Sequence, residues 1–228
     1  MVMKVNGYKI KPYADLRGAD LTIKELGGVN LKSADLHSAN LAGANLTGSD
    51  LAGADLTRAN LEGANLAGAY ICFADLTRTN LEGAILGYAN LTGSDLTKAN
   101  LSKANLEQAI MTGVDLTKAK LTNANLSGAD LTSSDLIRTS LWHTDLTDAI
   151  LAGADLYGAD LYGAILAGVN LSDANLSGAD LTNADLTKAN LSDANLSGVN
   201  LSGANLTTTM LHGANLTGAT MPDGSIHD

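Results

Sequence analysis

The side chains of this chain that could do chemistry are four histidines, one cysteine and many carboxylates. The histidines are His37, His143, His212 and His227. None of them has a second His or Cys at the spacing of a metal site. Cys72 has no neighbouring histidine to activate it as a nucleophile. The 24 Asp and Glu residues show no pattern that would enclose them, and exposed carboxylates keep ordinary acidity. We therefore expect that this protein is not an enzyme and that it has no cofactor and no metal site.

The element that must position these groups has a period of five residues. Leucine recurs at every fifth position from 16 to 221, except at Ile71, Met111 and Met221. A small residue, usually Ala, stands two places earlier, and Asp or Asn usually stands between them. A helix cannot use this period, because five residues turn about 500° and set successive leucines about 140° apart. A flat strand has a period of two. The pattern predicts a chain that turns a corner once per repeat, with Leu and Ala pointing inward and turns at the Gly- and Asn-rich corners.

The unbroken pattern over residues 14–221 resembles the pentapeptide-repeat family, and its cyanobacterial members in particular. The resemblance implies an all-β fold, a right-handed quadrilateral β-helix with four pentapeptides per coil and about ten coils. With a ladder spacing of about 4.8 Å, such a rod is about 50 Å long. We expect an N-terminal cap over 1–13, the β-helix over 14–221 and a C-terminal tail over 222–228. Asn6-Gly7 indicates a β-hairpin within the cap. Lys24 falls on an inward position, where an unpaired ammonium is costly, so we expect a distorted first coil from which Lys24 escapes.

Residues twenty apart stack on one another in such a coil, so the sequence maps onto four faces. The first face holds Leu16 and every twentieth residue after it; the second, third and fourth begin at Leu21, Leu26 and Leu31. The first face carries an acidic column beside a basic one, and we call these ten residues the charged stripe. They are Asp55, Asp75, Asp95, Asp115, Asp135, Arg58, Arg78, Lys98, Lys118 and Arg138. The stripe is either a recognition surface or a solvated face, in which the basic ladder offsets the acidic one and the Asp side chains bond to the turn backbone.

Five bulky residues gather where the first and second faces meet, and we call them the aromatic patch. They are Ile137, Trp142, His143, Tyr157 and Tyr162. Contiguous exposed aromatic residues are typical of a protein-binding site, although stacked rings also stabilise neighbouring coils. A second cluster lies on the third and fourth faces and is better explained by packing between coils. It comprises Tyr70, Cys72, Phe73, Ile85, Tyr88 and Ile110.

The net charge of −10 is confined to the second half of the chain. Residues 1–120 hold twelve basic and twelve acidic residues, whereas residues 121–228 hold two basic and twelve acidic ones. This half would repel nucleic acid directly. No apolar run reaches the roughly 20 residues that a membrane helix needs. With one cysteine and no signal-peptide pattern, we expect a cytoplasmic protein, a monomer or weak dimer.

The function that we expect is a non-enzymatic protein-interaction scaffold, whose partner the sequence does not identify. The alternative is a DNA mimic that binds DNA gyrase, or another DNA-binding protein, through the acidic C-terminal half. Some relatives in the family bind gyrase, but they resemble dimers joined by a C-terminal helix, which this chain lacks. A structural or cryoprotective rod is a third reading, favoured only by the column of Thr57, Thr77, Thr97 and Thr117.

Overall fold

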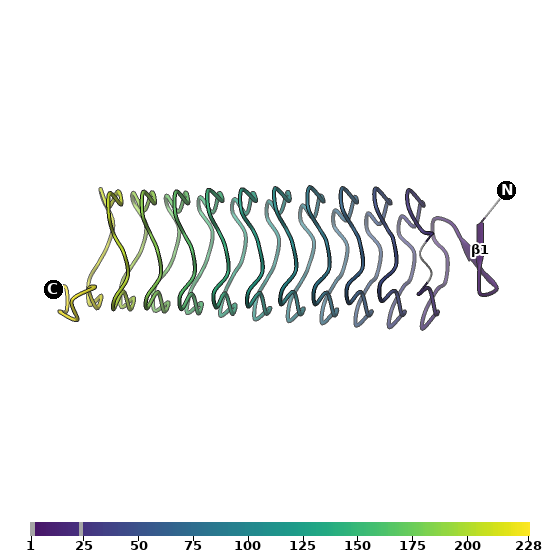
Figure 1. The fold of residues 1–228 in the computed structure, drawn as a ribbon, viewed down its shortest axis with the longest axis horizontal. Coiled ribbons are helices and arrows are strands. Elements are labelled where there is room, and N and C mark those ends of the chain that lie inside the picture. The colour runs from purple at the N-terminus through teal and green to yellow at the C-terminus, as the bar shows by residue number, and fades with distance from the viewer. Residues whose placement is uncertain (1–2, 23–24) are drawn as a thin grey trace.

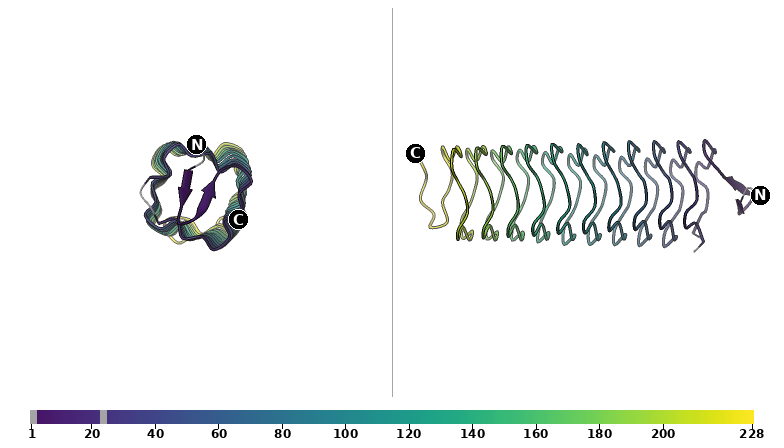
Figure 2. Two further views of the ribbon diagram at one scale, coloured as in Figure 1. Left: turned by 90° about the vertical axis from the view of Figure 1, so that its right-hand side faces the viewer. Right: turned by 90° about the horizontal axis from the view of Figure 1, so that it is seen from above.

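The computed structural model describes residues 3–22 and 25–228, which form one straight rod (Figure 1). Isolated parallel bridges join each Asp or Asn position to the residue twenty places later, from Asp15–Asp35 to Asn200–Thr220. Four pentapeptides therefore make one coil, and the end-on view shows the coils stacked as a square (Figure 2). The fold is a right-handed quadrilateral β-helix, as the sequence predicts. Lys24, expected to leave the interior, lies outside the described residues.

Each corner is a four-residue turn that begins at the inward leucine. In the first coil the Ala19 N–H donates to the Leu16 carbonyl at 3.0 Å. Gly18, the third residue of this turn, has φ of +61°, as a type II turn requires. Between coils, the Leu16 N–H donates to the Asp35 carbonyl at 2.7 Å and the Asp35 N–H to the Ala14 carbonyl at 2.9 Å. These bonds repeat along the rod and satisfy the backbone inside each coil.

The core is a ladder of inward leucines and small residues. All leucines from Leu16 to Leu201 are 0–1% exposed. Serine and threonine replace the small residue at six buried sites, where their hydroxyls need partners. The Thr79 hydroxyl donates to the Leu56 carbonyl at 2.8 Å, whereas the Ser49 hydroxyl has no partner among the described residues.

The two ends of the rod are finished differently. Strands β1 (Met3–Val5) and β2 (Tyr8–Ile10) form an antiparallel hairpin that lies across the N-terminal end of the square (Figure 2). Asn6 and Gly7 both have positive φ, and Val5 and Ile10 are buried within the core cluster. At the other end the tail folds back, so that Ile226 pairs antiparallel with Thr220. Within the described residues, no helix is long and apolar enough to cross a membrane.

Candidate protein-interaction surfaces

The aromatic patch contains three rings in mutual contact. The centroids of Trp142 and Tyr162 lie 5.1 Å apart at an interplanar angle of 38°. The His143 ring stands edge-on to Tyr162, with a centroid distance of 5.7 Å and an angle of 86°, and lies 5.7 Å from Trp142. The two contacts of His143 are edge-to-face arrangements, which aromatic pairs favour, and the Trp142–Tyr162 pair is tilted. Trp142 is 44% exposed, so the cluster presents a fixed apolar surface to solvent.

Neighbouring residues hold these rings in place. The bridge between Ser140 and Asp160 stacks the second-face repeat that carries Trp142 under the repeat that carries Tyr162. Gly163 leaves room for the imidazole, because a Cβ there would meet His143 Cε1 and Nδ1 at 2.6 Å. The Asn183 side-chain amide donates to the Tyr162 hydroxyl at 3.3 Å. The three rings are therefore ordered by the backbone ladder and by one glycine.

The other two members of the aromatic patch lie in the adjacent column, on the first face. Tyr157 is 46% exposed, and Ile137 is half-buried one coil below it. No ring contact joins Tyr157 to the three clustered rings within residues 3–22 and 25–228. The structure thus brings Trp142, His143 and Tyr162 together and leaves Tyr157 as a separate exposed ring.

The acidic column of the charged stripe is bonded to its own turns. Asp75 accepts the Thr77 N–H at 2.9 Å, and the equivalent bonds form at Asp55, Asp95 and Asp115. Asp135 has no such bond within the described residues. Burial raises the pKa of its carboxyl, and the charges of Asp115 and Asp155 in the same column raise it further. The stacked carboxylates therefore repel one another, as the sequence predicts.

The basic column of the charged stripe does not pair with the acidic one. Its five side chains are exposed, and within the part of the chain that the structure describes none of them forms an ion pair. The ion pairs lie elsewhere: Arg17 contacts Asp15 at 2.6 Å and Asp35 at 3.4 Å, and Lys103 contacts Glu82 at 2.9 Å. The offsetting of one ladder by the other is thus at most long-range, while the Asp side chains bond to the turn backbone.

The cluster on the third and fourth faces is more exposed than the aromatic patch. Phe73 is 72% exposed, Tyr88 68% and Tyr70 58%, although the Phe73 ring lies against Gly93 in the next coil. Ile85 and Ile110 are 43% and 44% exposed. The cluster is therefore an open apolar surface in its own right.

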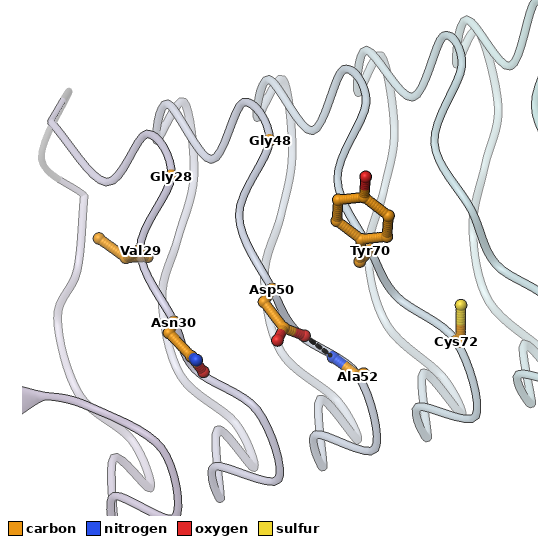
Figure 3. Close-up of a pocket in the computed structure, with 8 residues that line it drawn as sticks. All are labelled: Gly28, Val29, Asn30, Gly48, Asp50, Ala52, Tyr70 and Cys72. Carbon is orange, nitrogen blue, oxygen red and sulfur yellow. Dashed lines mark hydrogen bonds between the residues drawn. The ribbon is translucent and has the colours of Figure 1, made fainter.

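A cleft of about 520 Å³ adjoins this cluster on the fourth face, and its lining is drawn in Figure 3. It is lined by Gly28, Val29, Asn30, Gly48, Asp50, Ala52, Tyr70 and Cys72. Sequence reasoning placed no concave site on the rod, so this cleft is a correction. It forms because residues with side chains no larger than a methyl, Gly28, Gly48 and Ala52, stand on either side of the column from which Tyr70 projects. The sequence carried no specific signal for it, because glycines twenty residues apart, like Gly28 and Gly48, also recur elsewhere, as at Gly43 and Gly63.

The surroundings of Cys72 make its thiol unreactive. Its thiol lies 3.7 Å from the Asn90 carbonyl oxygen, and burial raises its pKa, with a smaller contribution from the Asp50 charge. A thiol with a raised pKa is a weak nucleophile at neutral pH. No group of three His, Cys, Asp or Glu side chains in the described ranges could hold a metal ion.

Known proteins resemble this chain in sequence and fold. The family model described as pentapeptide repeats matches it in eight copies, at residues 13–48, 34–71, 74–113, 109–148, 129–166, 154–193, 164–203 and 189–223. No curated protein sequence matches it. Among solved structures, HetL from the cyanobacterium Nostoc sp., a pentapeptide repeat protein involved in heterocyst differentiation regulation, is 40% identical, with a TM-score of 0.86 over 88% of this chain and 90% of HetL.

Two further structures are similar over parts of their length. A pentapeptide repeat protein from the thylakoid lumen of Arabidopsis thaliana is 38% identical, with a TM-score of 0.42 over 45% of this chain and 71% of that one. QnrB1, a plasmid-mediated fluoroquinolone resistance protein, is 20% identical, with a TM-score of 0.38 over 75% of this chain and 83% of that one. The eight family matches and the likeness to HetL show that this chain belongs to the pentapeptide-repeat family.

Proposed function

We propose that this protein is a non-enzymatic scaffold that binds a partner protein through the aromatic patch. The observation that carries the proposal is the contact cluster of Trp142, His143 and Tyr162 on the outside of the rod. Trp and Tyr are enriched among the residues that dominate binding energy, because they bury a large area with few rotatable bonds. Rings held by a rigid ladder lose little further freedom when a partner covers them.

The likeness to HetL supports a regulatory partner, since HetL is involved in heterocyst differentiation regulation. The proposal includes a cytoplasmic location and a monomer or weak dimer as the binding form. We propose no catalytic activity, because the exposed carboxylates and the weakly nucleophilic thiol of Cys72 form no catalytic constellation.

The test compares three forms of the protein as bait in lysate of the native host. The wild type, a Trp142→Ala/Tyr162→Ala double variant and a Tyr13→Ala control are used at low and moderate salt. Tyr13 is 75% exposed near the other end of the rod, so it controls for the loss of any surface ring. We expect a protein that the wild type and the control retain and the double variant loses. Retention by all three forms would exclude the aromatic patch as the binding site.

The acidic half of the chain supports a second candidate, a DNA mimic. Residues 121–228 carry the whole net charge of −10 over about five coils, which is roughly one charge per 2.5 Å, against about one per 1.7 Å in duplex DNA. This candidate predicts inhibition of gyrase supercoiling at low salt that disappears as salt rises. Unchanged supercoiling at a large excess of the protein would reject gyrase as the target.

A further inference from the structure

We propose that the cleft on the fourth face binds a lysine or arginine side chain of a partner protein. The cleft lies in the N-terminal half, on a different face from the aromatic patch, so either site could fail without the other. It is a second binding site on the same rod, and its ligand follows from the groups that line it.

The cleft is open to solvent and has small residues on its two borders. Gly28 and Gly48 stand on one border and Ala52 on the other, and none carries a side chain larger than a methyl (Figure 3). The Tyr70 ring projects at one end and is 58% exposed. The volume of about 520 Å³ lies within the range of roughly 300–1,000 Å³ that small-ligand sites occupy.

The polar groups of the cleft select a cation. Asp50 accepts the Ala52 N–H at 3.0 Å through one carboxylate oxygen, and its second oxygen has no partner within the described residues. The side-chain oxygen of Asn30 accepts the Lys32 N–H at 3.1 Å. No ion pair reaches Asp50 from residues 3–22 or 25–228. A guanidinium or ammonium group would complete the hydrogen bonding of this carboxylate, whereas an anion would be repelled.

The tyrosine adds a second attraction for the same kind of ligand. The face of an aromatic ring attracts a cation within about 6 Å, and the aliphatic stem of Lys or Arg packs well against apolar surface. Asp50 and Tyr70 lie in the same column, one coil apart, because their backbones form a β-bridge. A cation held by Asp50 therefore lies next to the ring.

The surroundings favour a protein as the source of this side chain. Phe73 directly follows Cys72 of the cleft lining, and its ring, which is 72% exposed, offers apolar area that a free small molecule would leave uncovered. A partner segment with a basic residue next to apolar ones matches this surface in charge and in polarity. Since the aromatic patch lies on the first and second faces, the rod has room for two partners at once.

Binding to the cleft can be tested without knowing the partner. The probes are butylguanidinium and its neutral isostere butylurea, added to the ¹⁵N-labelled full chain and followed by amide chemical shifts. We expect saturable shifts at Gly28, Gly48 and Cys72 with butylguanidinium in the millimolar range, and none with butylurea. Equal shifts with both probes, or no saturable shift, would overturn the proposal.

Two variants and a matched control locate the effect. We expect Asp50→Asn to weaken binding about fivefold and Tyr70→Ala about threefold, as loss of an exposed charge contact and of a cation–π contact implies. Asp130→Asn removes a carboxylate from the same column four coils further on and should leave the affinity unchanged. Asn already occupies this column at Asn30 and Asn90, so both Asn variants are compatible with the fold. Wild-type affinity in Asp50→Asn would refute the role of the carboxylate.

Discussion

Ser49→Ala should stabilise the protein, because the Ser49 hydroxyl is buried without a hydrogen-bond partner. The residue is 0% exposed, and its hydroxyl oxygen finds no partner among the described residues. Burying an unpaired hydroxyl costs about 1–3 kcal/mol. Alanine is the usual residue at this position of the repeat, so the variant creates no strain. We expect a gain of about 1 kcal/mol in the free energy of unfolding, the lower end of that range.

The assay is urea unfolding followed by far-UV circular dichroism and by the fluorescence of the single tryptophan. With a slope of about 2–3 kcal/mol per M, the gain should raise the midpoint by about 0.3–0.5 M urea. Since stability in a solenoid is the sum of local and nearest-neighbour contributions, both probes must be compared.

Ser94→Ala and Ser134→Ala are the matched controls for this prediction. Both hydroxyls are buried, but they donate to the Leu91 and Leu131 carbonyls at 2.5 Å and 2.6 Å. In these two variants the lost hydrogen bond offsets the free energy gained because the polar hydroxyl is no longer buried. We therefore expect the free energy of unfolding to change by less than about 0.5 kcal/mol. A midpoint for Ser49→Ala that is equal to or below those of the controls would refute the reasoning.

Three further predictions concern pH and packing. Asp135→Asn should raise the urea midpoint at pH 7, and this gain should vanish as the pH falls through the raised pKa of the folded carboxyl, which is then protonated. Asp185→Asn should do the reverse: hydrogen bonds lower the pKa of Asp185, so its stabilisation is present above the unfolded-state pKa and is lost as the pH falls through the folded one. If the urea midpoints of the two variants depended on pH in the same way, the opposite pKa shifts of Asp135 and Asp185 would be contradicted. Gly93→Ala should lower the free energy of unfolding by about 1 kcal/mol more than Gly113→Ala does. The new Cβ at Gly93 would meet the Phe73 ring at 2.6 Å, whereas nothing lies within 4 Å at Gly113. In a double-mutant cycle measured by thermal unfolding, adding Phe73→Ala should remove this difference.

Part of the candidate site could be predicted from the sequence, because one period governs the whole rod. Stacking at twenty residues placed Trp142 over the same face as Tyr162, and the ring contacts follow from that register. The sequence also placed the stacked carboxylates of the first face, whose mutual repulsion contributes to the raised pKa of Asp135.

Rotamers and cavities could not be predicted in this way, because they depend on side-chain directions that periodicity does not contain. The charged stripe was expected to be either a recognition surface or a solvated face, and the period did not reveal that its basic side chains form no close ion pairs within the described residues. Packing between coils was expected to explain the cluster on the third and fourth faces, and the Phe73 ring does lie over Gly93 in the next coil, but periodicity did not predict how much of Phe73 and Tyr88 remains exposed.

By itself, the sequence determined that the chain turns a corner every five residues with its leucines pointing inward. The coil of twenty residues, and with it the column in which each residue lies, followed from the resemblance to the pentapeptide-repeat family. Only the tertiary structure decided which hydroxyl is left unpaired, which rings touch and where the rod is hollowed. Those features arise from the order of large and small side chains in adjacent columns, as where Gly28, Gly48 and Ala52 border Tyr70. How far each side chain projects and which rotamer it adopts depend on contacts in the folded rod between residues about twenty positions apart.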